Sequence, residues 1–107
     1  MSSFDDREKG FENKYAHDEE LEFKAVARRN KLLGLWLAEK FGLTGAEADA
    51  YAKDVIASDF EEAGHEDVVR KVMGDIAARK ADISEHVVRV EMDRLMVIAR
   101  EQIRNQG

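Results

Sequence analysis

The chain contains no proline, so none of its 107 residues carries the side chain that most strongly breaks a helix. Only seven residues are glycine, while 37% are charged and 44% are apolar. Ala, Glu, Lys, Leu and Arg are abundant, and all five favour helices. We therefore predict an all-α fold. A chain of this length is expected to form one hydrophobic core.

The first two predicted helices are separated by a glycine. Apolar residues recur at intervals of three and four residues, or sums of these, from Glu19 onward, and Gly42 is a suitable left-handed residue to end that helix. The second helix is expected to begin at Thr44, where Glu47 completes a capping box, and to end near Gly64. The residues expected to face the core are Leu21, Ala25, Leu32, Leu35 and Trp36 in the first helix and Ala48, Tyr51, Ala52, Val55 and Ile56 in the second.

Two further helices are predicted in the second half of the chain. A short one follows His65 and Glu66, and the last begins at Asp82, where Glu85 completes a second capping box. Their expected core residues are Val68, Val69, Val72, Met73 and Ile76, and then Val88, Met92, Leu95, Ala99 and Ile103. The short connections predict antiparallel neighbours around a shared seam, so that residues 19–107 form a small four-helix bundle.

Residues 1–18 differ from the rest because charged and small polar residues dominate, and we interpret them as a flexible N-terminal arm. Its large apolar residues, Phe4, Phe11 and Tyr15, would lie within about 40° of one another on a helix. They could bury on the order of 500 Å², worth about 12 kcal/mol, against roughly 15 to 30 kcal/mol for ordering the backbone. We therefore expect the free arm to be disordered. It is either an ordinary frayed terminus or a segment that folds on a partner, and its three aromatic residues in helical register favour folding on a partner. The charged residues expected to pair with that partner are Asp5, Asp6, Arg7, Glu8 and Lys9.

Four basic residues lie close together in the first helix of this acidic chain, namely Lys24, Arg28, Arg29 and Lys31. One interpretation is a solvated helix face. The other is a docking patch for an acidic partner surface, where such charges mainly raise the association rate and fix the orientation. The net charge of −6 opposes binding to nucleic acid, so no nucleic-acid partner is expected.

The sequence contains no recognisable catalytic, metal or cofactor site. The absence of cysteine excludes disulfides, thiolate catalysis and Cys-ligated metal centres. A di-iron bundle needs two Glu-x-x-His motifs, whereas this chain has only Glu62 with His65, and Gly64 lies between them. No HExxH pattern, nucleophile motif or glycine-rich phosphate loop occurs. We therefore expect a partner-binding protein that is not an enzyme and needs no cofactor.

Nothing in the sequence predicts membrane insertion. MSSFDDREKG has no apolar signal-peptide region, and the longest apolar run, Leu32 to Ala38, is much shorter than a bilayer span. We expect a cytoplasmic protein that is monomeric when free.

Longer stretches of the sequence resemble a known family. FDDREKGFENKYAHDEELEFKA and ARRNKLLGLWLAEK, followed by AKDVIASDFEEAG and SEHVVRVEMDRLMVIAREQI, are similar to the zeta subunits, the small inhibitor proteins of alphaproteobacterial F-type ATP synthases. The similarity covers essentially the whole chain in order, which makes it more specific than any short motif.

This resemblance implies a four-helix bundle whose mobile arm inserts into the catalytic head of the synthase and blocks rotation in the hydrolytic direction. The family's arm is regarded as functionally similar to that of the mitochondrial inhibitory factor, although the remaining folds differ. The matching inhibitory segment runs from Phe4 to about His17. The protein would then be peripheral to the inner membrane through the synthase. The main alternative is a non-inhibitory helical adaptor or assembly protein that binds another partner.

Overall fold

The computed structural model describes the backbone of residues 3–60 and 65–106, and the side chains of residues 19–59 and 65–106. Within these ranges the fold consists of helices and connecting turns, without a strand, so the predicted all-α bundle with an N-terminal arm is confirmed. No helix in the described part of the chain combines the length and apolarity needed to cross a membrane. The elements are α1 (Ser3–Lys40), α2 (Ala46–Ala57), the short 3-10 helix η1 (Ser58–Phe60), α3 (Glu66–Ala78) and α4 (Glu85–Gln106).

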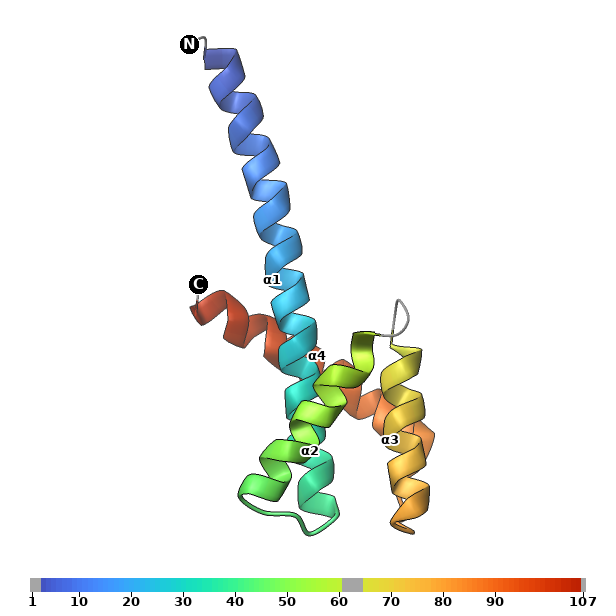
Figure 1. Ribbon diagram of the computed structural model, residues 1–107. Helices are drawn as coiled ribbons and strands as arrows, with labels where there is room; N and C mark the ends of the chain where they lie inside the picture. The colour runs from blue at the N-terminus through green and yellow to red at the C-terminus, as the bar shows by residue number, and fades with distance from the viewer. Residues whose placement is uncertain (1–2, 61–64, 107) are drawn as a thin grey trace.

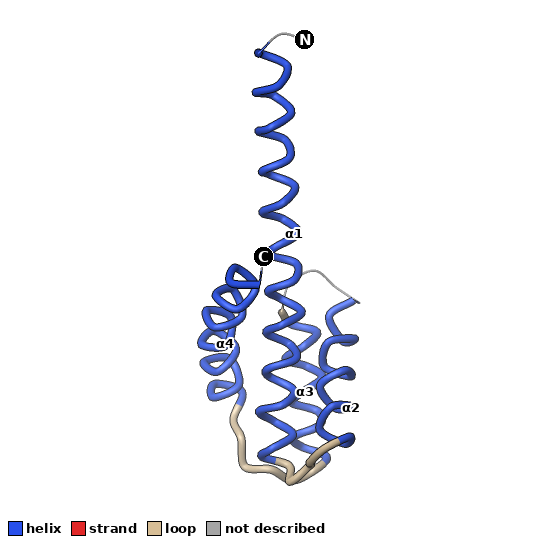
Figure 2. Tube along the Cα trace, turned by 90° about the vertical axis from the view of Figure 1, so that its left-hand side faces the viewer, coloured by secondary structure: helices blue, strands red, loops and turns tan. Residues whose placement is uncertain are grey.

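Helix α1 is the central element of the bundle. Its C-terminal half packs against α2 and α4, and its N-terminal part projects away from the other helices (Figure 1 and Figure 2). Helix α2 returns antiparallel to α1 after a tight turn. In that turn Gly42 and Gly45 have φ angles of 77° and 57°, a conformation that glycine adopts without strain.

Helix α4 packs mainly on α1, and it approaches its sequence neighbour α3 much less closely. This differs from the expectation that each helix would pack on the next one along the chain. The physical reason is that α1 carries apolar residues around much of its circumference, so it can cover two helices at once. The connection 79–84, which contains Lys80 at a φ of 55°, turns the chain so that α4 crosses α1 (Figure 1).

All four helices contribute to one main core. Its fully buried residues are Leu33, Leu37, Ala38, Val55, Val68, Val72 and Val88. Every residue expected to face the core in α4 is buried. In α1 the buried face is centred on Leu33 and Leu37, whereas the predicted Leu32, Leu35 and Trp36 are only half-buried. A smaller second cluster joins Ala25, Met96 and Ile103, where α4 crosses α1.

Neither predicted capping box is present. Helix α2 is preceded by Gly45, and no side chain caps its first turn, because Gly45 displaces Thr44 from the capping position. Helix α4 is capped by Ser84, whose Oγ accepts a hydrogen bond from the backbone N–H of Val87 at 3.2 Å. Asp82 stands two residues too early for that role.

Candidate partner-binding surfaces

The predicted inhibitory arm is the N-terminal part of α1. Its backbone is helical from Ser3 and continues without a break into the bundle, so the predicted boundary between residues 18 and 19 lies inside one helix. The predicted arm residues Phe4, Asp5, Asp6, Arg7, Glu8, Lys9, Phe11 and Tyr15 lie outside the described side chains. The helical backbone has the periodicity that the predicted aromatic stripe requires.

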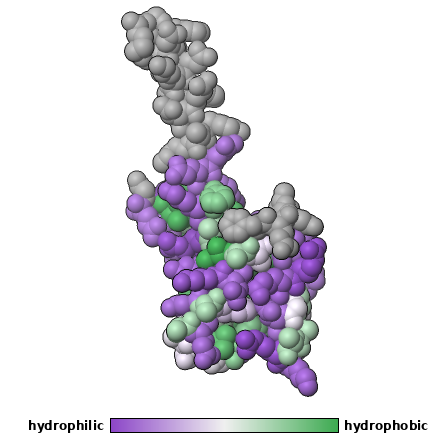
Figure 3. Space-filling model, in the orientation of Figure 1, coloured by the Kyte–Doolittle hydropathy of each residue, from purple (hydrophilic) through white to green (hydrophobic). Residues whose placement is uncertain are grey.

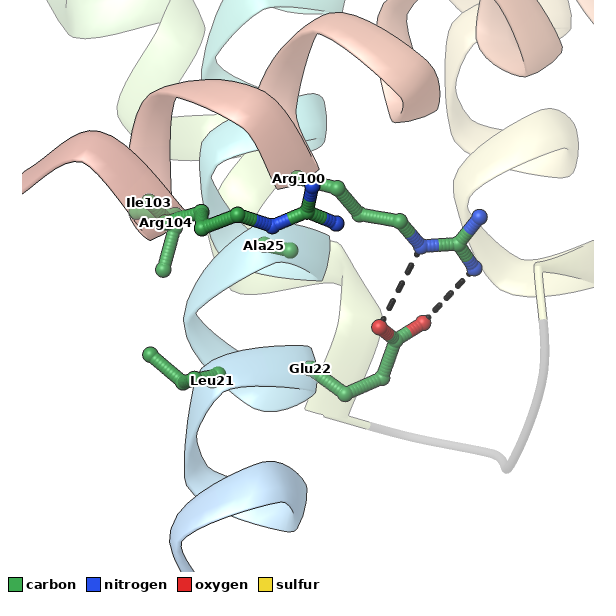
Figure 4. Close-up of a pocket in the computed structure, with 6 residues that line it drawn as sticks. All are labelled: Leu21, Glu22, Ala25, Arg100, Ile103 and Arg104. Atoms are coloured by element: carbon green, nitrogen blue, oxygen red, sulfur yellow. Dashed lines mark hydrogen bonds and ion pairs between the residues drawn. The ribbon is translucent and has the colours of Figure 1, made fainter. Parts of the chain in front are cut away.

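At the base of the arm, α1 is held by the C-terminal half of α4 (Figure 4). The Arg100 guanidinium donates two hydrogen bonds to the Glu22 carboxylate, at 2.8 and 3.2 Å. This contact lowers the pKa of Glu22 and raises the pKa of Arg100. Ala25 and Ile103 line the adjoining cavity of about 200 Å³. A surface ion pair and an apolar contact therefore fix the position at which the arm leaves the bundle.

The structure removes Arg29 from the predicted docking patch. Its side chain is 2% exposed, and its guanidinium donates to Asn30 Oδ1 at 2.9 and 3.0 Å and to His65 Nδ1 at 3.0 Å. Burial lowers the pKa of Arg29, while the negative charges of Asp59 and Asp93 oppose that shift. Because His65 directly precedes α3, the buried guanidinium links α1 to the start of α3 and is not available to a partner.

The other three basic residues of the predicted patch remain at the surface. Lys24 forms an ion pair with Glu20 at 3.1 Å. The guanidinium of the half-buried Arg28 donates hydrogen bonds to Gln102 Oε1 at 3.0 Å and to Gln106 Oε1 at 3.2 Å, near the end of α4. Lys31 is exposed and has no ion pair within the described residues. Their proposed docking role stays a prediction.

These three cations line an open groove that the sequence did not reveal. Phe23 lines the same groove and is 67% exposed. Ile56 and Ile103 contribute apolar surface from α2 and α4. The sequence contained one indication of this exposed surface. Phe23 does not lie on the apolar helix face formed by Leu21 and Ala25, so it was not among the predicted core residues.

The described residues contain no group of three or more His, Asp or Glu side chains that could hold a metal ion. His65, from the single Glu-x-x-His match, contacts Arg29 instead. Glu62, the other member of that match, lies outside the described residues.

Comparisons with known proteins identify the family. The family model described as ATPase inhibitor subunit zeta matches residues 1–102, which include both the arm and most of the bundle. A protein solved by solution NMR is 50% identical in sequence, with a TM-score of 0.72 over 81% of this chain and 99% of that chain. No curated protein matches. The agreement of the family model over nearly the full length, together with the four-helix fold, shows that this chain belongs to the ATPase inhibitor subunit zeta family.

Proposed function

We propose that this protein is a non-catalytic regulatory subunit that inhibits ATP hydrolysis by an F-type ATP synthase. Its N-terminal arm would insert into the catalytic head, and the protein would be peripheral to the inner membrane through the synthase. The observation that carries the proposal is the family match, because it begins at residue 1 and so includes the arm as well as the bundle.

The geometry of α1 supports insertion of the arm. Helix α1 has 38 residues, which corresponds to a length of about 57 Å, and the molecule measures 64 × 26 × 21 Å. Residues 3–18 therefore contribute about 24 Å of single helix. A single helix can enter a cleft between subunits, whereas the wider bundle would remain outside and limit the depth of insertion.

The aromatic stripe of Phe4, Phe11 and Tyr15 would supply most of the binding energy of the inserted arm, because buried aromatic side chains dominate interface energetics. The charged residues between Asp5 and Lys9 would pair with groups of the head and fix the register. The block would be directional, because a rotor turning in the synthesis direction could expel the arm. That directionality follows from the family resemblance.

Replacing Phe4 and Phe11 together by alanine tests the proposal. Loss of two aromatic anchors is expected to raise the concentration needed for half-inhibition of ATP hydrolysis by at least about 100-fold. The melting temperature should stay unchanged, because both positions precede Leu21, the first residue of the described hydrophobic clusters.

Asn13→Ala is the matched control, because position 13 lies about 180° from Phe4 around the helix. This control should inhibit as well as the wild type. Unchanged inhibition by the double variant would contradict the proposed role of the arm. A loss of binding on changing Lys24 and Arg28, with no effect at Phe4 and Phe11, would support the adaptor alternative.

A further inference from the structure

A groove beside the base of the arm is a second candidate docking surface. It lies between α1, the end of α2 and the end of α4, and has a volume of about 430 Å³. Ala27, Ile56 and Ile103 provide apolar lining from these three helices, and the exposed ring of Phe23 adjoins them. Figure 3 shows hydrophobic surface beside hydrophilic surface below the point at which the arm leaves the bundle.

Of the three cations that border the groove, only Lys24 forms an ion pair within the described residues. Lys31 has no ion pair within the described residues, and the guanidinium of Arg28 donates to neutral amide oxygens, which satisfy its donors without neutralising it. Lys24 pairs with Glu20, but both side chains are more than half exposed and are therefore screened by solvent. Among the described residues that line the groove, these three are cations and none is acidic, although the chain carries a net charge of −6. The surface is complementary to an acidic partner.

The arrangement of the groove along α1 fits a helix as its occupant. Phe23, Ala27 and Lys31 follow one another at intervals of four residues, so the groove runs along the α1 axis for about 12 Å. The small side chain of Ala27 at its centre lets a second helix approach closely, with the ridges of one helix packed into the grooves of the other. An amphipathic helix could place apolar side chains beside Phe23 and carboxylates against the cations.

We propose that this groove binds an acidic amphipathic helix on the surface of the catalytic head, as a contact separate from the inserted arm. This inference rests on the proposed function, because it takes the head as the partner. The groove contact steers association through its charge and then holds the bundle beside the entry point of the arm, which raises the effective concentration of the arm there. Phe23 and the arm belong to the same helix, so one molecule can make both contacts.

The rate of association with the purified, immobilised catalytic head tests the groove contact. The groove variant is full-length protein with Phe23→Ser and Lys31→Glu. The matched control is Val97→Ser with Lys53→Glu, because Val97 is 64% exposed, Lys53 is exposed, and neither lines the groove. Both variants change the net charge equally, so only the position of the change differs between them.

The groove variant is expected to associate at least about tenfold more slowly than the wild type at low salt, and the control at the wild-type rate. Raising the salt concentration should slow the wild type more than the groove variant. Equal rates for the groove and control variants, with normal wild-type binding, overturn the groove proposal and leave the proposed function standing. Absence of wild-type binding overturns both.

Site-directed crosslinking tests the nature of the occupant. The chain has no cysteine, so Phe23→Cys provides one attachment point for a benzophenone maleimide, and Val97→Cys provides the control. Crosslinks from position 23 are expected in a helix of the head that carries several Asp or Glu side chains, and they should be absent from position 97. Crosslinks from position 23 to a strand or to a basic segment overturn the acidic helix as the occupant.

Discussion

Gly34 and Gly74 both lie inside helices, but only one of them is required by packing. A Cβ atom at Gly34 would lie 2.6 Å from the Cα of Ala52, so α1 and α2 can approach this closely only because position 34 has no side chain. A Cβ atom at Gly74 would have no neighbour within 4 Å. The two glycines therefore provide a matched pair for separating helix propensity from packing.

Gly34→Ala is expected to destabilise the fold by about 1 to 3 kcal/mol, because overpacking outweighs the better helix propensity of alanine. Gly74→Ala is expected to stabilise the fold by up to about 1 kcal/mol, because alanine has the better helix propensity and its Cβ meets no neighbouring atom there. Urea denaturation of both variants measures the two free energies of unfolding. Stabilisation by both substitutions would contradict the close packing of α1 on α2.

Tyr51 is a buried titratable group in the core. Its hydroxyl donates a 2.8 Å hydrogen bond to Asp75 Oδ2, which also forms an ion pair with Lys71 at 2.8 Å. Burial is the largest cause that raises the pKa of Tyr51, and the hydrogen bond to Asp75 adds to it. The folded state therefore favours the neutral phenol. The resulting stability is present below the unfolded pKa of about 10 and is lost as the pH rises above it.

Tyr51→Phe makes this pH dependence measurable. At pH 7 the variant is expected to be less stable than the wild type by about 1 kcal/mol, because one hydrogen bond is lost. Above pH 10 the free energy of unfolding of the wild type should fall by about 1.4 kcal/mol per pH unit because Tyr51 ionises in the unfolded state. The difference in stability between the wild type and the variant should therefore disappear near pH 11. Urea denaturation from about pH 7 to 11.5 measures the free energy of unfolding of both proteins. A difference that stays constant with pH would contradict the shifted pKa.

At the level of elements, the contact between α1 and α4 consists of two parts. The main core includes Val88 and Leu95 of α4, whereas Ile103 belongs to the smaller cluster with Ala25 and Met96 at the base of the arm. Because this cluster is small and lies apart from the main core, it can open locally while the rest of the bundle stays folded.

Ile103→Ala is expected to weaken this local contact by about 2 kcal/mol, because it removes buried aliphatic groups. Amide hydrogen exchange should become faster in residues 19–26 and 98–106 and remain unchanged in residues 33–38. Val97→Ala, at a position that is 64% exposed, is the control and should change neither segment. A uniform increase across all four helices would mean that the base of the arm does not open separately.

The sequence predicted the helices well because their apolar periodicity is strong. In α4, all five expected core residues, from Val88 to Ile103, are buried. The helix starts were less predictable because Gly45 and Ser84, rather than the predicted Thr44 and Asp82, stand at the capping positions. Local patterns also could not show that α4 packs mainly on α1, because this choice depends on contacts between residues distant in sequence.

The candidate surfaces were only partly predictable. Because arginine is usually exposed, Arg29 was predicted to lie at the surface. It is buried instead, and its guanidinium donates hydrogen bonds to Asn30 beside it and to His65, which lies 36 positions further along the chain. Phe23 lies off the apolar face of Leu21 and Ala25, but the groove that it borders is completed by Ile56 of α2 and Ile103 of α4. A sequence pattern does not contain that information.

For the whole molecule, the central feature is one helix with two roles. Helix α1 forms the middle of the core over its C-terminal half and provides the arm over its N-terminal part. In the proposed function, the bundle anchors and orients the arm, and the arm is the inhibitory element. The central claim is therefore that inhibition requires residues 1–18, whereas folding does not.

The most direct test compares ATP hydrolysis by the purified catalytic head in the presence of the full-length protein and of a version lacking residues 1–18. Circular dichroism first establishes that the shortened protein is helical and melts cooperatively, because the described core lies within residues 25–103. The account predicts inhibition by the full-length protein and none by the folded shortened protein at the same concentration. Equal inhibition by both proteins would contradict it.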